Sequence, residues 1–106
     1  MGETVRKKKR YVALEAHGIE RITPLDMFEL VAHMVKEIFG DYGLAETELS
    51  WVRMVDKNNV AVIRCGKDQV EKVRFATLFI KKIGDVKMGL RVVRISGTVK
   101  GAIGKR

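Results

Sequence analysis

The 106-residue sequence contains one cysteine, one proline and no long apolar run, and each shortage excludes a class of protein. The single Cys65 cannot form an intramolecular disulfide or a cysteine-based zinc site, which fits a reducing compartment. No segment approaches the roughly 18 apolar residues of a membrane span. The basic first ten residues are not followed by the apolar stretch and small-residue cleavage site of a signal peptide. We therefore expect a cytoplasmic protein without membrane contact.

Side chains suited to catalysis or metal binding are also sparse. His17 and His33 have no third ligand at metal-binding spacing. The 13 carboxylates are scattered and show none of the paired motifs of a two-metal nuclease centre. Ser96 and Cys65 lack the local signature of an activated nucleophile. We predict no catalytic residue and no metal site on this chain.

The net charge of +8 is concentrated at the two ends of the chain. Residues 1–10 carry five basic side chains against Glu3, and residues 86–106 carry six basic side chains and no acid. The segment between them has a net charge of −2. Charged residues that served only solubility would be spread along the whole chain and not be concentrated at its ends. The ends are either frayed basic tails or part of a polyanion site, for which backbone phosphates are the natural target.

Apolar periodicity and turn residues predict six elements in the order β-α-β-β-α-β. Thr23 and Pro24 suit a helix start, and Gly40 is placed to end that helix. The predicted elements are a strand over residues 10–17, a helix over 24–40, a hairpin of strands 49–55 and 60–65, a helix over about 68–83, and a strand over 90–99 interrupted by Gly97.

This order predicts an α+β fold, the ferredoxin-like two-layer sandwich with a four-stranded antiparallel sheet that is also typical of RNA recognition motifs. We expect a single domain over residues 10–99 between basic tails, 1–9 and 100–106. The fold's sheet order of fourth, first, third and second strand places Arg10 near Gly97 to Lys100, so both basic ends converge. The predicted RNA-binding residues are Lys7, Lys8, Lys9, Arg10, Arg91, Arg94, Lys100, Lys105 and Arg106.

The mode of RNA binding follows from the sheet residues. Stacking of bases on the sheet is not expected, because the strand over residues 60–65 contains no aromatic residue and the first strand offers only Tyr11. Arg91 and Arg94 are three positions apart on the last strand, so we expect them on opposite faces of the sheet. One of them would then be free to contact phosphate.

More apolar surface is present than two helices on one sheet face can cover. The second helix carries Phe75, Leu78 and Phe79 in addition to its core positions, and Trp51 stands on a strand of the hairpin. A protein partner or self-association would cover this surplus, and a locally thick core is the alternative. Trp51 could also stack a base. We predict a protein interface at Trp51, Phe75, Leu78 and Phe79.

Three segments together resemble a known family. Phe39-Gly40-Asp41-Tyr42-Gly43, the strand over residues 60–65 and the segment from Leu90 to Thr98 are similar to protein component 2 of archaeal ribonuclease P. The resemblance covers residues 10–98, and the terminal tails match only in being basic.

The resemblance implies a subunit of the ribonucleoprotein that removes the 5′ leader from precursor tRNA, with the active site in the RNA and magnesium serving the RNA-based reaction. It also implies ribonuclease P RNA, precursor tRNA and a larger barrel-fold protein subunit as partners, and a homodimer is an open alternative. The glycines have structural alternatives to RNA contact. Gly40 and Gly43 would end a helix and turn the chain, and Gly97 would mark a bulge.

Two other functions remain open at this point. One is a free-standing RNA-binding module of ferredoxin-like fold. The other is a small hydrolase of that fold, such as an acylphosphatase. The glycine-arginine loop that follows the first strand of acylphosphatases is missing, because the chain here reads Gly18-Ile19-Glu20-Arg21.

Overall fold

The computed structural model describes residues 8–56 and 59–103. Its main sheet has the strand order β2-β3-β1-β6, and every neighbouring pair is antiparallel. The predicted α+β class and strand order are confirmed. The elements are β1 (Lys9–His17), α1 (Pro24–Thr47), β2 (Ser50–Asp56), β3 (Val60–Gly66), the 3-10 helix η1 (Lys67–Gln69), α2 (Val70–Thr77), β4 (Lys82–Ile83), β5 (Val86–Lys87), β6 (Gly89–Ser96) and α3 (Val99–Ile103).

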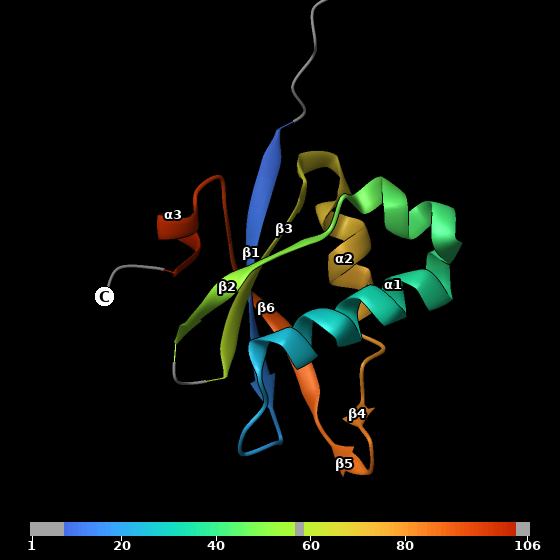
Figure 1. Cartoon of the computed structure of the whole chain (residues 1–106), viewed down its shortest axis with the longest axis vertical. Helices are drawn as coiled ribbons and strands as arrows, with labels where there is room; N and C mark the ends of the chain where they lie inside the picture. The colour runs from blue at the N-terminus through green and yellow to red at the C-terminus, as the bar shows by residue number, and fades with distance from the viewer. Residues whose placement is uncertain (1–7, 57–58, 104–106) are drawn as a thin grey trace, which may run out of the picture.

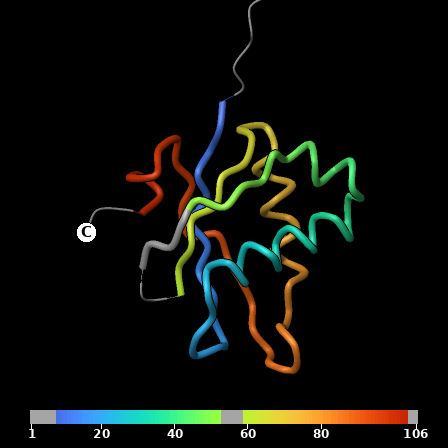
Figure 2. Tube along the Cα trace, viewed as in Figure 1, coloured from blue at the N-terminus to red at the C-terminus, as the bar shows by residue number. Residues whose placement is uncertain are grey.

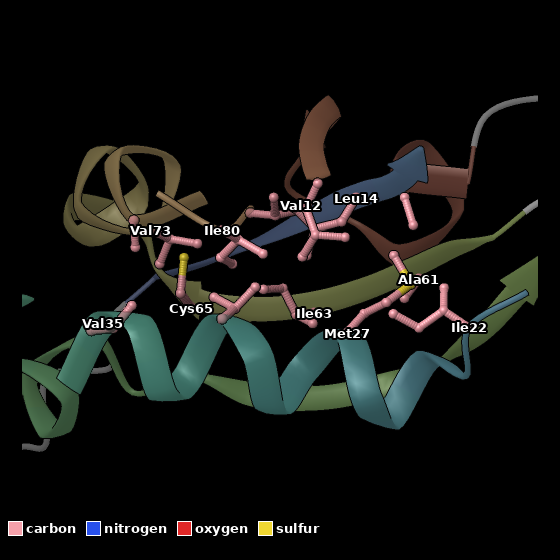
Figure 3. Packing of buried hydrophobic residues seen from close by; sticks show 14 of the residues in the cluster. Val12, Leu14, Ile22, Met27, Val35, Ala61, Ile63, Cys65, Val73 and Ile80 are labelled. Atoms are coloured by element: carbon pink, nitrogen blue, oxygen red, sulfur yellow. The ribbon is translucent and has the colours of Figure 1, made fainter. Parts of the chain in front are cut away.

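The two longer helices and the short third helix lie on opposite sides of the sheet. In Figure 1, α1 and α2 lie on one side of the strands and α3 lies on the other. Side chains of β1 alternate between these sides, and Val12 and Leu14 join the larger core under α1 and α2. Figure 3 shows Met27 and Val35 of α1 directed toward Ile63 and Cys65 of β3 in this core. The fold is therefore held mainly by burial between the sheet and the two helices.

Helix α1 begins as predicted and ends later than predicted. The Thr23 hydroxyl accepts a hydrogen bond from the Asp26 backbone N–H at 3.1 Å, which caps the first turn. Gly40 leaves the helical conformation, with φ 81° and ψ 175°, but a second helical segment follows and reaches Thr47. The predicted end at Gly40 is thus a kink between two helical segments. The sequence pattern located the break and missed the segment beyond it.

The second helix is shorter than the predicted 68–83. After Thr77 the backbone N–H groups of Leu78, Phe79 and Ile80 bond to carbonyls three residues back, which is the tighter 3-10 pattern. Ile80 is nevertheless buried at 4% exposure, as its place on the predicted core face requires. A small hairpin of β4 and β5 follows, turning at Gly84 with φ 59°. The stop expected at Gly84 is this hairpin turn.

The last predicted strand also ends early. Strand β6 stops at Ser96 and α3 follows, so the predicted strand over residues 90–99 and the tail expected from Lys100 are both interrupted by a helix. The Thr98 hydroxyl accepts a hydrogen bond from the Gly101 backbone N–H at 3.0 Å, which starts this helix. Thr98 is therefore the local signal for α3. The bulge expected at Gly97 lies instead at Val93.

The predicted convergence of the two ends of the domain is confirmed for the described residues. Tyr11 pairs with Ser96, and the Nη1 atom of Arg10 lies 3.6 Å from the position that a Cβ on Gly97 would take. In the Cα trace of Figure 2, β1 runs beside β6, and α3 lies next to both. Within the described ranges no helix is long and apolar enough to cross a membrane.

Candidate nucleic-acid interface

The sheet face opposite α1 and α2, here called the open face, carries the polar side chains of β1. Tyr11, Ala13 and Glu15 point to this face, because they alternate with residues of the core under the helices. Helix α3 covers its centre, where Ala102 is 2% exposed and packs with Ala13 and Val62. This cover leaves no room for bases at the centre of the face, and the mode of RNA binding stays a prediction.

Arg91 and Arg94 both point to the open face, and the prediction that they lie on opposite faces is wrong. Arg91 pairs with Glu15 and Arg94 pairs with Ala13, two residues of β1 that share a face. The register shifts between these pairs and leaves Val93 as the extra residue of a β-bulge. Because the bulge adds one residue, side chains three positions apart on β6 face the same way.

A third arginine of the open face was missed in the sequence. Arg64 of β3 stands directly opposite Tyr11 in the ladder, and its Nε donates a hydrogen bond to the Ser50 hydroxyl at 3.3 Å. The sequence contains a signal for this orientation, because Arg64 stands between the apolar residues Ile63 and Cys65 of a predicted strand. Both neighbours are 0% exposed in the structure. A charged residue between two buried strand residues must point to the other face of the sheet.

The open-face arginines differ in their partners. Arg91 donates two hydrogen bonds to Glu15 Oε1, at 2.9 Å from Nη2 and 3.2 Å from Nε. Arg64 and Arg94 form no ion pair with a carboxylate whose side chain the structure describes. Among the described side chains, this face therefore has two guanidinium groups that are not neutralised by a described acid, and a third whose charge is offset by Glu15.

The predicted basic ends are brought together only in part. Lys9 forms an ion pair with Glu48, which neutralises its charge locally. Arg10 Nη1 donates to the Lys9 carbonyl at 3.1 Å and lies beside Gly97, so it does belong to the junction of β1 and β6. Lys8 and Lys100 are exposed, whereas Lys7, Lys105 and Arg106 lie outside the described residues.

Helix α1 has the opposite charge from the open face. It carries five carboxylates against one lysine, for a net charge of −4. A phosphate backbone is repelled by such a surface and attracted by the arginines on the other side of the sheet. The charged residues of α1 are Asp26, Glu29, Lys36, Glu37, Asp41 and Glu46.

An apolar surface lies at the end of α2 and on the residues that follow it, away from the open face. Phe75 is 44% exposed, Leu78 64% and Phe79 47%, so these side chains are accessible, and the protein interface at them stays a prediction. The Phe75 ring lies 5.1 Å from that of Phe79 and 6.1 Å from that of Phe39, centroid to centroid. Trp51, 40% exposed, stands on the edge strand β2 and pairs with Ile63. The rings of Phe39, Phe75 and Phe79 form a partly solvated aromatic row of the kind that protein partners cover.

Comparison with known proteins identifies the family. The model of the Rpp14/Pop5 family matches residues 8–105, nearly the whole chain. The chain belongs to the Rpp14/Pop5 family. This confirms the resemblance noted in the sequence, since the curated relatives of this Rpp14/Pop5 chain include archaeal ribonuclease P proteins.

Two relatives and one solved structure illustrate the similarity. Ribonuclease P protein component 2 of Pyrococcus horikoshii is 30% identical over 98 residues, which are 92% of this chain and 81% of that relative. The protein of the same name from Methanocaldococcus jannaschii is 25% identical, over 93% of this chain and 72% of its own length. A chain in the cryo-EM structure of yeast ribonuclease MRP superposes with a TM-score of 0.62 at 11% identity, covering 91% of this chain and 79% of that one, which supports the fold.

Potential metal ligands do not gather in the described part of this Rpp14/Pop5 chain. Among the side chains that the structure describes, no group of three His, Cys, Asp or Glu could hold a metal ion. His33 lies 3.8 Å from Glu37 on the exposed side of α1, where the two form an ordinary surface pair. The magnesium that the family resemblance implies has no ligand set among these side chains.

Cys65 is expected to be unreactive in the native Rpp14/Pop5 fold. Burial raises the pKa of its thiol from 9.0 to about 11, although nearby Lys9 acts in the opposite direction. The reactive thiolate is therefore scarce at neutral pH. We expect labelling by a disulfide reagent at pH 8 to follow global opening, and full labelling at once in denaturant. Rapid native labelling would contradict this burial.

The same shift makes stability depend on alkaline pH. Because the folded thiol holds its proton more tightly than the unfolded thiol, its contribution is complete below pH 9 and is lost as the pH rises toward about 11. Denaturant titrations of the wild type and Cys65→Ala between pH 8 and 11 would measure this. The wild type should lose stability more steeply than the variant over that interval.

Proposed function

We propose that this chain is a noncatalytic protein subunit of ribonuclease P, the ribonucleoprotein that removes the 5′ leader from precursor tRNA. Membership of the Rpp14/Pop5 family makes it a ribonuclease P subunit. In this proposal the active site and its magnesium belong to the RNA, and the chain binds and supports that RNA together with a partner protein. The cytoplasm remains the expected compartment.

The observation that carries the proposal is the match over nearly the entire domain to ribonuclease P proteins. The structure adds one support, which is the distribution of charge. The open-face arginines lie across the sheet from the acidic α1, and such a separation of charge is typical of an RNA-binding subunit.

RNA binding should depend mainly on phosphate contacts. The described basic residues at the junction of the two ends, Lys8, Arg10 and Lys100, would add to the arginines of β6. Each neutralised phosphate releases counterions, so affinity falls with salt. With four to six contacts, we expect log affinity against log salt to have a slope of about −3 to −5.

Titrating the full chain into a ribonuclease P RNA transcript at several salt concentrations measures this slope. Poly-glutamate of similar charge is a suitable competitor control, because it tests general attraction to polyanions. A nearly flat salt dependence would be inconsistent with phosphate-dominated binding.

A protein partner is proposed for the apolar surface of α2. Phe75, Leu78 and Phe79 are exposed together, and Lys72 Nζ lies 5.3 Å from the centroid of the adjoining Phe39 ring. Exposed aromatic rings in a row are typical of the centre of protein interfaces. We propose the larger barrel-fold ribonuclease P protein as the occupant, with Trp51 at the margin of the interface, and a second copy of this chain as the competing occupant.

Affinity purification from the native cell extract tests the proposed function. The tagged chain should recover ribonuclease P RNA, identified by sequencing, and the eluate should cleave precursor tRNA at the mature 5′ end. A free-standing RNA-binding module would recover other RNAs without this cleavage. Turnover of a substrate by the purified chain alone would favour a hydrolase and contradict the proposal.

A further inference from the structure

We infer that the open face of the sheet is an RNA phosphate-binding surface, with Arg64, Arg91 and Arg94 around α3 as its contacting residues. This inference rests on the proposed function and goes beyond it, because it adds Arg64 of β3 and places the contacts on one surface built by three strands. These three residues are called the open-face arginines below.

The ladder places these side chains on both sides of β1. Arg64 lies on β3, whereas Arg91 and Arg94 lie on β6, and both strands pair with β1. Since neighbouring strands are about 4.8 Å apart, the two arginine-bearing strands are separated by about 10 Å. A guanidinium group on either side of this interval can bind successive parts of one phosphate backbone, using its rigid set of donors.

Helix α3 determines which part of RNA can be contacted. It covers Ala13 and Val62, which are 1% and 0% exposed, so the middle of the sheet is closed to bases. The arginines around it remain accessible, since Arg91 and Arg94 are exposed and Arg64 is half-buried. A surface with accessible guanidinium groups and a closed apolar centre suits phosphates rather than base edges or stacked bases.

The charge pattern favours RNA over a protein on this face. Arg64 and Arg94 have no carboxylate partner among the described residues, and Glu15 opposes Arg91 alone. The acidic helix α1 lies across the sheet, and the exposed aromatic row lies on α2. A polyanion is therefore drawn to the open face, while a protein partner has its apolar surface elsewhere.

The β-bulge at Val93 is the positioning device of this surface. Without the extra residue in the register, side chains at positions 91 and 94 would point to opposite faces. Arg94 would then enter the layer occupied by Val92 and Ile95, which pack against the core. The bulge instead keeps two arginines on one face and the two apolar side chains on the other.

The test measures binding of the full-length chain to a ribonuclease P RNA transcript. Arg64→Ala and Arg94→Ala should each weaken binding by about five- to tenfold at 0.1 M salt and reduce the salt slope by about 1. Arg74→Ala is the matched control, because Arg74 is an exposed arginine on α2 that already pairs with Glu71. It should leave both affinity and slope unchanged. Thermal melts establish that each variant is folded.

A gain of affinity is expected from removing the acid of the open face. Glu15→Gln releases Arg91 from its ion pair and removes a charge that repels phosphate, so RNA binding should tighten by about two- to fourfold at 0.1 M salt. Glu29→Gln removes the same charge from an exposed position on α1 and should leave RNA affinity unchanged. A merely structural role of the Arg91–Glu15 pair would give no such gain.

The outcomes separate this inference from the proposed function. If the wild type binds the RNA and supports cleavage but the Arg64 and Arg94 variants match it, the inference is overturned and the proposed function stands. The inference is also overturned if Arg74→Ala loses as much RNA affinity as the Arg64 and Arg94 variants. It is likewise overturned if the Arg64 and Arg94 variants bind a protein partner more weakly while their RNA affinity is unchanged. If the wild-type chain neither binds the RNA nor affects cleavage, both the function and the inference are overturned.

Discussion

Replacing Phe75 and Phe79 together by aspartate is expected to weaken binding to the larger ribonuclease P protein by about a hundredfold or more. Both rings are nearly half exposed and contact each other at 5.1 Å between centroids, so a partner would cover them as one unit. Buried interface aromatics commonly contribute about 2 kcal/mol or more each. Two carboxylates at the centre of such an interface would add a desolvation penalty. Calorimetric titration of the purified partner measures the loss.

Leu25→Asp is the matched control for this double variant. Leu25 is 50% exposed and lies at the start of α1. Its substitution therefore introduces a carboxylate at an apolar position about as exposed as Phe75 and Phe79. Its partner affinity should equal that of the wild type. If the double variant binds normally, α2 is not the interface. If it unfolds, the rings belong to the core. Sedimentation of the chain alone would show whether the same substitutions abolish a homodimer.

Gly40→Ala is expected to cost about 1–3 kcal/mol of stability without changing RNA affinity. Gly40 has φ 81° and ψ 175°, a backbone region that is almost restricted to glycine. A Cβ at this position would meet no atom within 4 Å, so the cost comes from the backbone and not from a steric clash. For a domain of this size the melting temperature should fall by about 4–8 °C for each kcal/mol.

Gly84→Ala provides a comparison in the turn between β4 and β5. Its φ is 59° and its surroundings are equally open, so alanine there should cost only about 1 kcal/mol, as expected in the left-handed helical region. Thermal melts, together with RNA titrations of the folded variants, distinguish a conformational role of Gly40 from direct contact with RNA. Lost RNA affinity in a stable Gly40→Ala chain would mean that this glycine contacts RNA directly. A Gly40→Ala chain as stable as the wild type would contradict the conformational argument.

Local sequence patterns predicted those features of the fold that depend on short-range chemistry. Alternation and turn residues located β1 and the β2-β3 hairpin, and the Thr23-Pro24 pair located the start of α1. The order of the elements then specified the sheet, because few topologies suit β-α-β-β-α-β. Family resemblance added the function, which none of these patterns contains.

The features that were missed depend on contacts between distant segments. The bulge at Val93 is a matter of register between β6 and β1, and no residue type near it requires an extra position. Helix α3 is only five residues long and is stabilised by placing Ala102 on the sheet, so its own sequence is a weak signal. Both features determine the open face. The sequence could therefore identify basic residues without showing which of them share a surface.

Reconstitution of precursor-tRNA cleavage from purified components tests the central claim most directly. The RNA and the other protein subunits are assembled with and without this chain, and the initial rate is measured across a magnesium series. The account predicts that adding the chain increases the rate most at low magnesium, that the chain alone cleaves nothing, and that no single carboxylate substitution in it abolishes cleavage by the assembled particle. A carboxylate variant that assembles normally but is inactive at every magnesium concentration would contradict the account, as would an unchanged rate when the chain is omitted.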